Sequence, residues 1–350
     1  MENAVRRSFA RSFGSIGSKA ALIAHPLGAA MKLAETLRIG DRRHKFSATR
    51  SLMGTQVSIV ALHLSKEAAQ SAVAAAFSEI ERLSAIFDRR QPDSPVSQLN
   101  ETGKLSDVPP ELFEVMGKAQ AYYHRSGGTF DLTVMPVIEM LQNHMDPKGR
   151  LLLSQSDFDD AMALVGSNFV HISRNGISFD RNSMSVTMDG IGRGYIVDRA
   201  SDIMVENGVE NHLIIAGGDI RARGERTPGQ PWIVAIEDLS GKGRYPAVIQ
   251  LKNAAVATSG GCEFYLDAER YHYHVPKPVN AQSHGHGCQI SLSVAAPTVM
   301  EADALSTSAF VMNPQGAIRF INAQKESECL ISGLSGVKMT SRNWESLVGI

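Results

Sequence analysis

The chain has 350 residues, of which 43% are hydrophobic and 20% are charged, and its formal net charge at pH 7 is -1. This composition excludes a disordered chain and indicates a globular protein with enough apolar material for a large core. The small net charge of mixed sign gives no electrostatic basis for a polyanionic partner, so we expect no nucleic acid binding. An anionic ligand must therefore be held by local groups.

Neither the cysteines nor the start of the chain carries a clear export signal. Cys262, Cys288 and Cys329 are odd in number and widely spaced, so they do not describe a disulfide framework. No apolar run reaches the roughly 20 residues that a membrane helix needs, and the first residues show no hydrophobic signal core or lipid-accepting cysteine. We therefore expect a cytoplasmic location ahead of a periplasmic one, although the basic, Ser-rich start leaves an unusual export signal open.

The first elements are a broken helix, a strand and a long helix. Residues 20–37 are amphipathic but interrupted at Pro26 and Gly28, which predicts a broken helix outside the main body. Residues 53–64 alternate and are rich in β-branched side chains, which predicts the first core strand. Residues 66–87 repeat apolar side chains at helical spacing, which predicts a helix with one buried face. That face comprises Val73, Phe77, Ile80, Leu83 and Phe87.

The remaining elements continue this mixed pattern. Pro92 and Pro95 break the chain, and Pro109 begins a second helix that ends at Gly127-Gly128. Strands are predicted at 169–172, 176–179, 185–188, 212–216, 232–237, 245–251, 254–259 and 290–295. Helices are predicted at 194–207, 301–311 and 314–323. Strand runs outnumber crossover units and no fixed-period repeat occurs, so we predict an α+β fold and not a Rossmann fold.

The helix predicted at 301–311 carries the sharpest signal for chemistry. Asp303 and Thr307 are four residues apart, so a carboxylate and a hydroxyl project from one helix face. Two hard oxygen ligands suit Mg²⁺, which keeps several waters and completes its shell with substrate phosphates. The alternative is a helix cap, in which Asp303 accepts backbone donors of the first turn. Taken alone, the spacing favours the cap.

A glycine-rich turn between a predicted strand and a predicted helix is the second signal. Gly190, Gly192 and Gly194 would let the backbone approach a pyrophosphate, and the following helix offers unpaired amides. The spacing differs from the Rossmann fingerprint, and a tight strand-to-helix turn is the competing interpretation. Arg193 adds a fixed positive charge that could meet phosphate.

Two further segments carry polar residues of interest. Residues 214–219 end a buried strand in a paired-glycine bend, and strand ends frequently hold ligands. A histidine in the later Tyr-His-Tyr-His segment could act as a general base, because its unperturbed pKa lies near neutrality. His272 and His274, with the segment 284–288, also place soft ligands at alternating positions; a transition-metal site stays open, but a solvated polar loop is favoured.

Taken in order, these segments resemble the ApbE family of FAD:protein FMN transferases. The resemblance runs from about Met53 to Val311 and consists of short motifs whose shared order makes coincidence an unconvincing explanation. The motifs are Met53-Gly54-Thr55, Pro92–Asn100, Ser126–Asp131 with Thr133, Val134 and Pro136, Gly190–Asp198, Gly217–Ile220, Pro231-Trp232, Ala257–Gly260 and Ala302–Thr307.

The resemblance implies a fold, a reaction and partners. The implied architecture is an ApbE-like α+β fold related to the T-fold, with an N-terminal extension at 1–48, a transferase domain at 49–340 and a tail at 341–350. The implied reaction is the Mg²⁺-dependent transfer of the FMN moiety of FAD to a Thr or Ser hydroxyl of an acceptor flavoprotein, with release of AMP. The acceptor would belong to a bacterial redox or respiratory system and could be membrane-associated.

The resemblance also assigns roles to residues of this chain. The positions that match metal contacts are Gly190, Asp303 and Thr307. His274 matches the histidine that resembles the family's base. The positions at or beside FAD contacts are Met53, Gly127, Gly128, Thr129, Phe130, Thr187, Asp189 and Arg193.

Three departures from the family pattern leave a second function open. Thr187 stands where the family usually has Asp, Arg193 where Lys is frequent, and Lys277 begins the segment that replaces Asp-Pro-x-Thr-Gly. Because residues two apart on a strand face one side, Asp189 could supply the missing carboxylate. Thr187 and the altered segment after His274 favour a protein that binds FAD or FMN without transferring it, whereas the intact pair of Asp303 and Thr307 favours catalysis.

Overall fold

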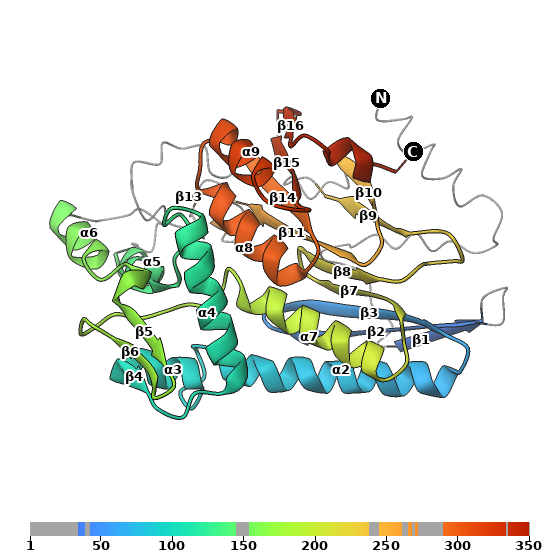
Figure 1. Cartoon of the computed structure of the whole chain (residues 1–350), viewed down its shortest axis with the longest axis horizontal. Coiled ribbons are helices and arrows are strands. Elements are labelled where there is room, and N and C mark those ends of the chain that lie inside the picture. Colours follow the sequence, from blue (N-terminus) through green and yellow to red (C-terminus); the bar gives the residue numbers. More distant parts are fainter. Residues whose placement is uncertain are drawn as a thin grey trace.

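The computed structural model describes residues 34–38, 43–144, 154–237, 245–260, 265–267, 270–271, 290–333 and 335–349. Its centre is a nine-stranded sheet in the order β1-β2-β3-β7-β8-β11-β14-β15-β16 (Figure 1). Every neighbouring pair in this sheet is antiparallel. A Rossmann fold needs parallel strands joined by crossover helices, so this α+β arrangement is not one.

The bounds of the elements are as follows. The strands of the large sheet are β1 (Ala34–Arg38), β2 (His44–Leu52), β3 (Thr55–His63), β7 (Asn211–Ala216), β8 (Asp219–Arg223), β11 (Ala254–Gly260), β14 (Ile290–Ala296), β15 (Glu328–Gly333) and β16 (Lys338–Thr340). The smaller sheets are formed by β4 (Lys104–Leu105), β6 (Gly176–Phe179) and β5 (Val170–Ser173), by β9 (Trp232–Ile236) and β10 (Ala247–Leu251), and by β12 (Tyr265–Asp267) and β13 (Arg270–Tyr271). The helices are α2 (Lys66–Phe87), α3 (Pro95–Thr102), α4 (Pro110–Arg125), α5 (Met135–Asn143), α6 (Gln155–Met162), α7 (Gly192–Glu206), α8 (Val299–Phe310) and α9 (Pro314–Asn322), with shorter turns η1 (Leu132–Val134), η2 (Ser167–Phe169) and η4 (Trp344–Leu347).

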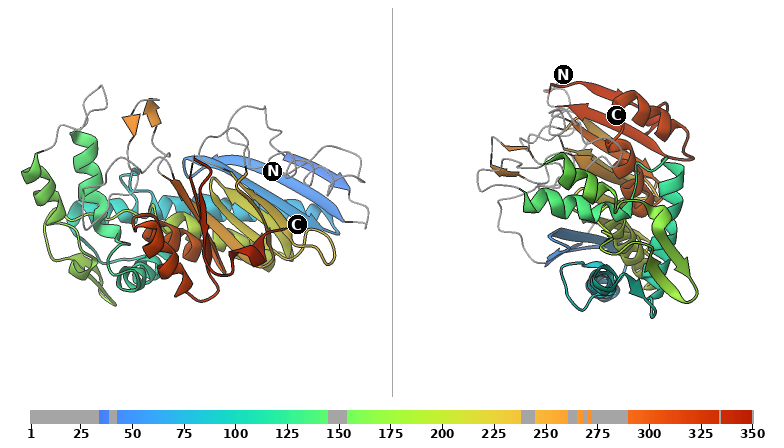
Figure 2. Two further views of the ribbon diagram at one scale, coloured as in Figure 1. Left: turned by 90° about the horizontal axis from the view of Figure 1, so that it is seen from above. Right: turned by 90° about the vertical axis from the view of Figure 1, so that its left-hand side faces the viewer.

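The large sheet separates two hydrophobic cores. Helices α2, α7 and α8 pack on one face of it, as Figures 1 and 2 show. The β9–β10 ribbon and η4 cover the other face, where Trp232 and Trp344 are buried. Side chains alternate between the two faces along each strand, so Ile59 of β3 belongs to the core under the helices and its neighbour Val60 to the core under the ribbon. None of the helices in the described part of the chain is long and apolar enough to cross a membrane.

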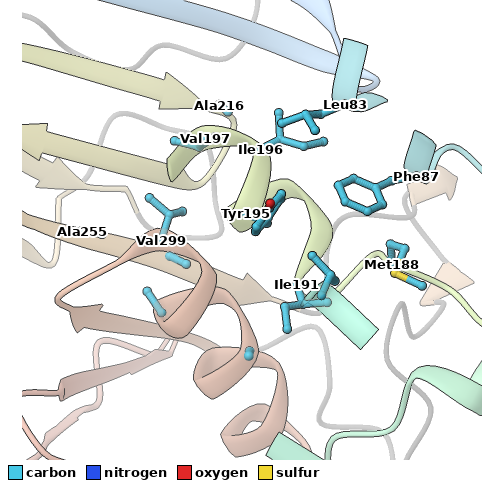
Figure 3. Packing of buried hydrophobic residues seen from close by; sticks show 14 of the residues in the cluster. Leu83, Phe87, Met188, Ile191, Tyr195, Ile196, Val197, Ala216, Ala255 and Val299 are labelled. Carbon is cyan, nitrogen blue, oxygen red and sulfur yellow. The ribbon is translucent and has the colours of Figure 1, made fainter. Parts of the chain in front are cut away.

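Helix α2 forms as its sequence predicts. Ser65 caps it by accepting the N–H of Ala68, and all five residues of the predicted face are buried. At its end, Phe87 packs edge-to-face on Tyr195 of α7, with ring centroids 5.8 Å apart. Figure 3 shows this cluster of Phe87, Tyr195 and Met188 around the first turn of α7. The long helix thereby fixes where α7 begins.

The start of the chain differs from the prediction. Residues 34–38 form strand β1, so the end of the predicted broken helix is wrong, and residues 20–33 lie outside the described part of the chain. The nine residues of β2 pair with β3, although only Phe46 among them is buried, and this polar strand next to the edge strand β1 left no alternating pattern to detect. The sheet therefore starts before the predicted boundary at residue 48, and Trp344 of the predicted tail is 1% exposed.

The strand predicted at 185–188 is wrong because a side chain takes the place of a neighbouring strand. Asn100 accepts the N–H of Val186 (2.7 Å) and donates to its carbonyl (2.9 Å). The N–H of Thr187 donates to the carbonyl of Leu132 (2.9 Å). The segment is buried, but its backbone bonds go to these groups instead of a sheet.

A buried histidine joins α7 to β7. His212 is fully buried, with Nδ1 2.9 Å from the carbonyl of Val209 and Nε2 2.7 Å from Oγ of Ser201. Both bonds are made by a neutral ring that donates from Nδ1 and accepts at Nε2. Burial lowers the pKa of His212 to about 4, and the Val209 carbonyl opposes this shift. The folded protein therefore holds this ring neutral.

We expect acid to weaken the fold through this ring. Its folded-state pKa lies below the unfolded value, so its contribution to stability is complete above about pH 6.5 and is lost as the pH falls towards 4. The free energy of unfolding should fall by about 3 kcal/mol over that range, measured by urea unfolding at several pH values. His212→Gln should flatten the dependence, and His171→Gln, at an exposed site, should not. An unchanged slope in His212→Gln would assign the acid sensitivity elsewhere.

Candidate active site

The glycine turn before α7 lies directly against the helix that carries the predicted metal ligands. A Cβ atom placed on Gly190 would lie 3.0 Å from Cγ2 and 3.1 Å from Oγ1 of Thr307. Gly194, one turn further along, donates its N–H to Oδ2 of Asp303 (3.3 Å). The structure therefore brings together Gly190, Asp303 and Thr307, the three residues predicted for the metal site.

Asp303 does not cap its own helix. It is the fifth residue of α8, and the N-cap is Thr298, whose hydroxyl accepts the N–H of Glu301 (3.2 Å). The capping alternative is therefore wrong, because the first turn of α8 is satisfied by other residues. Asp303 is 4% exposed and faces the glycine turn, where a buried carboxylate needs donors or a cation.

Asp198, at the end of the Gly190–Asp198 motif, completes the cap of α8 from a different helix. One of its carboxylate oxygens accepts the N–H of Val299 (3.0 Å) and the other that of Met300 (2.9 Å). Burial raises the pKa of Asp198 to about 6, although these amides and Arg221 act in the opposite direction. Nε of Arg221 lies 3.6 Å from the Asp198 carboxylate, and burial lowers the pKa of Arg221.

Two ion pairs of opposite direction attach α7 to β8. Arg193 of α7 pairs with Asp219 of β8, and Asp198 of α7 pairs with Arg221 of β8. Asp219 is 1% exposed and Arg221 is 6% exposed, so both pairs lie within the layer between helix and sheet. Arg193, predicted to meet phosphate, is thus held in the first turn of α7 by a buried carboxylate.

The end of α4 returns towards this site through two glycines. Gly127 (φ 63°) and Gly128 (φ 83°) adopt the left-handed conformation, and Gly128 donates its N–H to the carbonyl of Tyr123 (2.9 Å). The hydroxyl of Thr129 donates to the carbonyl of Ser126 (3.2 Å). The helix therefore ends as predicted, and the turn leads straight into Phe130.

Phe130 is the residue of this turn that reaches the site. It is 2% exposed, packs edge-to-face on Tyr122 with centroids 6.0 Å apart, and would lie 3.2 Å from a Cβ on Gly190. The next residue, Asp131, accepts bonds from the backbone and hydroxyl groups of both Thr133 and Ser167. Phe130 thus packs against the glycine turn, while Asp131 stabilises the adjoining loop through Thr133 and Ser167.

Three of the remaining motifs meet at one end of the sheet. Met53 (φ 53°) and Gly54 (φ 70°) form the two-residue turn between β2 and β3. A Cβ on Gly217 would lie 3.1 Å from Oγ1 of Thr55, and one on Gly218 would lie 3.4 Å from the carbonyl of Thr258. Met53 therefore lies at the sheet end that also presents Asp219 to Arg193.

A pair of serines that the sequence did not single out links this sheet end to α8. Oγ of Ser259 and Oγ of Ser306 are 2.8 Å apart, and Ser306 donates to the carbonyl of Asp303 (3.0 Å). Because Ser306 has one hydroxyl proton, Ser259 is the donor to Ser306. Both serines lie inside motifs of the family resemblance, Ala257–Gly260 and Ala302–Thr307. That position is the sequence feature that could have identified them.

The two residues proposed for the missing carboxylate have different surroundings. Thr187 is 4% exposed, and its hydroxyl accepts the N–H of Asp189 (3.2 Å). The side chain of Asp189 is 43% exposed and pairs with Arg89 at 3.4 Å. The strand alternation invoked for Asp189 does not hold here, because the segment is not a strand. Replacement of the missing carboxylate by Asp189 stays a hypothesis.

This hypothesis predicts a measurable effect on flavin binding. If Asp189 contacts FAD, Asp189→Asn should weaken FAD binding by about tenfold, because one charge-assisted hydrogen bond is lost. Flavin fluorescence titration measures the affinity, and Asp180→Asn, at another exposed carboxylate, is the control. Equal FAD affinities for the wild-type protein and Asp189→Asn would end the hypothesis.

The predicted base and the histidine-rich segment lie outside the described residues. His274, Lys277 and the residues at 284–288 all fall in the span 272–289. Within the described ranges, no group of three or more His, Cys, Asp or Glu side chains is placed to hold a metal ion. A site built from Asp303, Thr307 and the backbone near Gly190 supplies few side chains but only hard oxygen atoms, which fits Mg²⁺ better than zinc.

Comparisons with known proteins identify sequences and structures similar to this chain. A sequence profile of the ApbE family matches residues 53–331. The FAD:protein FMN transferase of Haemophilus influenzae is 26% identical over 237 residues, which is 65% of this chain and 68% of the relative. That of Salmonella typhimurium is 27% identical over 234 residues, which is 64% of this chain and 66% of the relative. The alignments thus span about two thirds of these relatives.

Solved structures show the same fold. Flavin Transferase ApbE from Vibrio cholerae superposes with a TM-score of 0.75 at 21% identity, covering 87% of this chain and 100% of that one. The ApbE protein of Thermotoga maritima gives a TM-score of 0.76 at 23% identity, with the same coverage. The architecture is therefore the predicted α+β architecture of ApbE proteins. Because the profile covers most of its length, the chain belongs to the ApbE family. The predicted transferase class is confirmed by the curated relatives.

Proposed function

We propose that this protein transfers the FMN half of FAD to a hydroxyl group of an acceptor protein and releases AMP. The observation that carries the proposal is the contact of Gly190 with Thr307 beside the bond from Gly194 to Asp303. A glycine turn, which has no side chains to keep a phosphate from the backbone, thereby faces two oxygen ligands on α8. The curated relatives, named FAD:protein FMN transferases, support the same reaction.

The proposed reaction is a transfer of the FMN phosphoryl group from AMP to the acceptor hydroxyl. The acceptor hydroxyl oxygen forms a bond to the phosphorus of FMN, the bond from that phosphorus to the bridging oxygen breaks, and AMP leaves with the electron pair. The hydroxyl proton passes to a base, for which His274 is the proposed residue. Mg²⁺ held by Asp303 and Thr307 would neutralise charge on the diphosphate and polarise the bond that breaks.

Residues of this chain orient the substrate around that bond. Arg193, fixed by Asp219, places a positive charge in the first turn of α7. The amides that begin α7 add a partial positive charge at the same end of the helix. Phe130 closes the glycine turn on its buried side. We therefore propose that the diphosphate binds beside the contact of α7 with α8, next to Arg193, Asp303 and Thr307.

A flavin-binding protein without transfer activity is the second candidate. Thr187 stands at the position of the usual family Asp, and its hydroxyl is already bound to the N–H of Asp189. The sequence after His274 also differs from the family pattern. Bound FAD that stays intact with Mg²⁺ and an acceptor present would favour this candidate.

The test is a transfer assay with defined products. Purified protein, FAD and Mg²⁺ are incubated with candidate flavoproteins of bacterial redox or respiratory systems, including membrane-associated ones. Release of AMP together with a gain of one FMN by the acceptor supports transfer. Co-expression in the cytoplasm or with export to the periplasm, followed by in-gel flavin fluorescence, tests the acceptor and the compartment, and we propose the cytoplasm.

A further inference from the structure

The contacts between the α7 region and α8 follow one register. Gly190 lies against Thr307, Gly194 bonds to Asp303, and Asp198 bonds to the N–H of Val299. Each step of four residues along the α7 region is matched by a step of four along α8 in the opposite direction. Residues four apart lie on one helix face, so the three contacts form a single seam.

Close approach of the two backbones makes this seam rigid in its middle. A Cβ on Gly194 would lie 2.7 Å from both Cα of Met300 and the carbonyl oxygen of Val299. Helices α7 and α8 pack against each other, and Figure 3 shows Tyr195 of α7 and Val299 of α8 in the same buried cluster. Sliding one helix past the other would break this contact, since packed interiors are not continuously deformable.

The end of the seam opposite Thr307 is held by Asp198 and Arg221. Asp198 uses one oxygen for each of the first two amides of α8. Arg221 approaches that carboxylate from β8 and also donates to the carbonyl of Pro297, just before the N-cap residue of α8. The start of α8 is thus tied to both α7 and the sheet.

We propose that Asp198 and Arg221 are positioning residues for the metal site, because they set the register of α8 and so the places of Asp303 and Thr307 relative to Gly190. This inference rests on the proposed function. A slip of α8 by one residue would move its side chains by about 1.5 Å along the axis and about 100° around it. Mg²⁺ demands near-ideal octahedral geometry, so even a fraction of that slip should weaken the site.

A purely structural cap would behave differently. Losing a cap lowers the stability of the helix but leaves the affinity of a distant metal site unchanged. A positioning role predicts weaker metal binding at unchanged flavin affinity. The measurement that separates the two is therefore metal affinity in the folded protein, which needs no turnover.

The experiment titrates Mn²⁺ into the full-length protein with FAD present and follows free Mn²⁺ by electron paramagnetic resonance. Asp198→Asn keeps one acceptor for α8 and replaces the other with a donor that opposes an N–H. We expect its Mn²⁺ dissociation constant to rise about tenfold or more, as for other residues that orient metal ligands. FAD affinity measured without metal should change less than twofold.

Asp202→Asn is the matched control, because it removes the same charge one turn further along α7, where Asp202 pairs with Arg199 and Arg223. It should bind Mn²⁺ as the wild-type protein does. Arg221→Met provides a second test should Asp198→Asn not fold, and it should also weaken Mn²⁺ binding. Hydrogen exchange at Val299 and Met300 reports whether each variant has loosened the start of α8.

The outcomes distinguish this inference from the proposed function. If Asp198→Asn and Arg221→Met loosen the start of α8 but bind Mn²⁺ as tightly as the wild-type protein, the positioning role is wrong and the proposed function stands. If the wild-type protein binds FAD but not Mn²⁺, the metal site itself is wrong and both proposals fall. Weaker Mn²⁺ binding in Asp202→Asn would also overturn the inference, since net charge would then explain the effect.

Discussion

Replacing Asp303 by Asn should lower the rate of FMN transfer by on the order of 10²- to 10³-fold, because the substitution removes the only carboxylate of the proposed metal site. Asn keeps an oxygen that can accept the N–H of Gly194, so the seam between α7 and α8 should survive. The loss should therefore be in chemistry and not in folding. AMP release at saturating FAD, measured over a range of Mg²⁺ concentrations, gives the rate and the metal dependence together.

Two further variants on α8 make this prediction specific. Thr307→Val keeps the side-chain shape but removes the hydroxyl next to Gly190, and it should also lower the rate. Glu301→Gln removes another carboxylate of α8, one that pairs with Arg125 instead of facing the glycine turn, and should leave the rate unchanged. A wild-type rate in Asp303→Asn, or equal losses in Asp303→Asn and Glu301→Gln, would remove the metal site from the mechanism.

The sequence predicted the bounds of an element well where buried apolar side chains recur at a regular spacing. The helix predicted at 66–87 has those same bounds, because its apolar residues recur at helical spacing and are buried on one face. Strand β2 was missed because it pairs near a polar sheet edge and buries only Phe46. The segment 185–188 has a strand-like sequence, but Asn100 supplies its hydrogen bonds from 86 residues away, which no local pattern can show.

Part of the candidate site could be predicted, namely the part that depends on spacing within one helix or on a short local motif. Asp303 and Thr307 could be paired from their spacing on one helix, and Gly190 from its motif. The positioning role proposed for Asp198 and Arg221 could not be recognised from local sequence, since their contacts with the start of α8 cross more than 70 residues of chain. The helix-cap alternative for Asp303 failed because Thr298 and Asp198 already satisfy the first turn of α8. Long-range contacts, which sequence spacing does not reveal, decide these roles.

Adding one methyl group at Gly194 should damage both the fold and the site. The new Cβ in Gly194→Ala would lie 2.7 Å from backbone atoms of α8, where no flexible side chain can move aside. We expect a loss of about 2 to 3 kcal/mol in the free energy of unfolding, since the two helices must separate to admit it. Separation would also lengthen the bond from Gly194 to Asp303, so Mn²⁺ affinity should fall in the protein that remains folded.

Gly117→Ala is the control that separates the effect of the close contact at Gly194 from the general effect of replacing a helical glycine by alanine. Gly117 lies within α4, and a Cβ there would meet no atom within 4 Å. Alanine should therefore stabilise α4 by about 0.5 to 1 kcal/mol, because it lowers the entropy of the unfolded chain. Urea unfolding should thus move in opposite directions for the two variants. If Gly194→Ala were as stable as Gly117→Ala, the α7–α8 seam would be too loose to fix the register of Asp303 and Thr307.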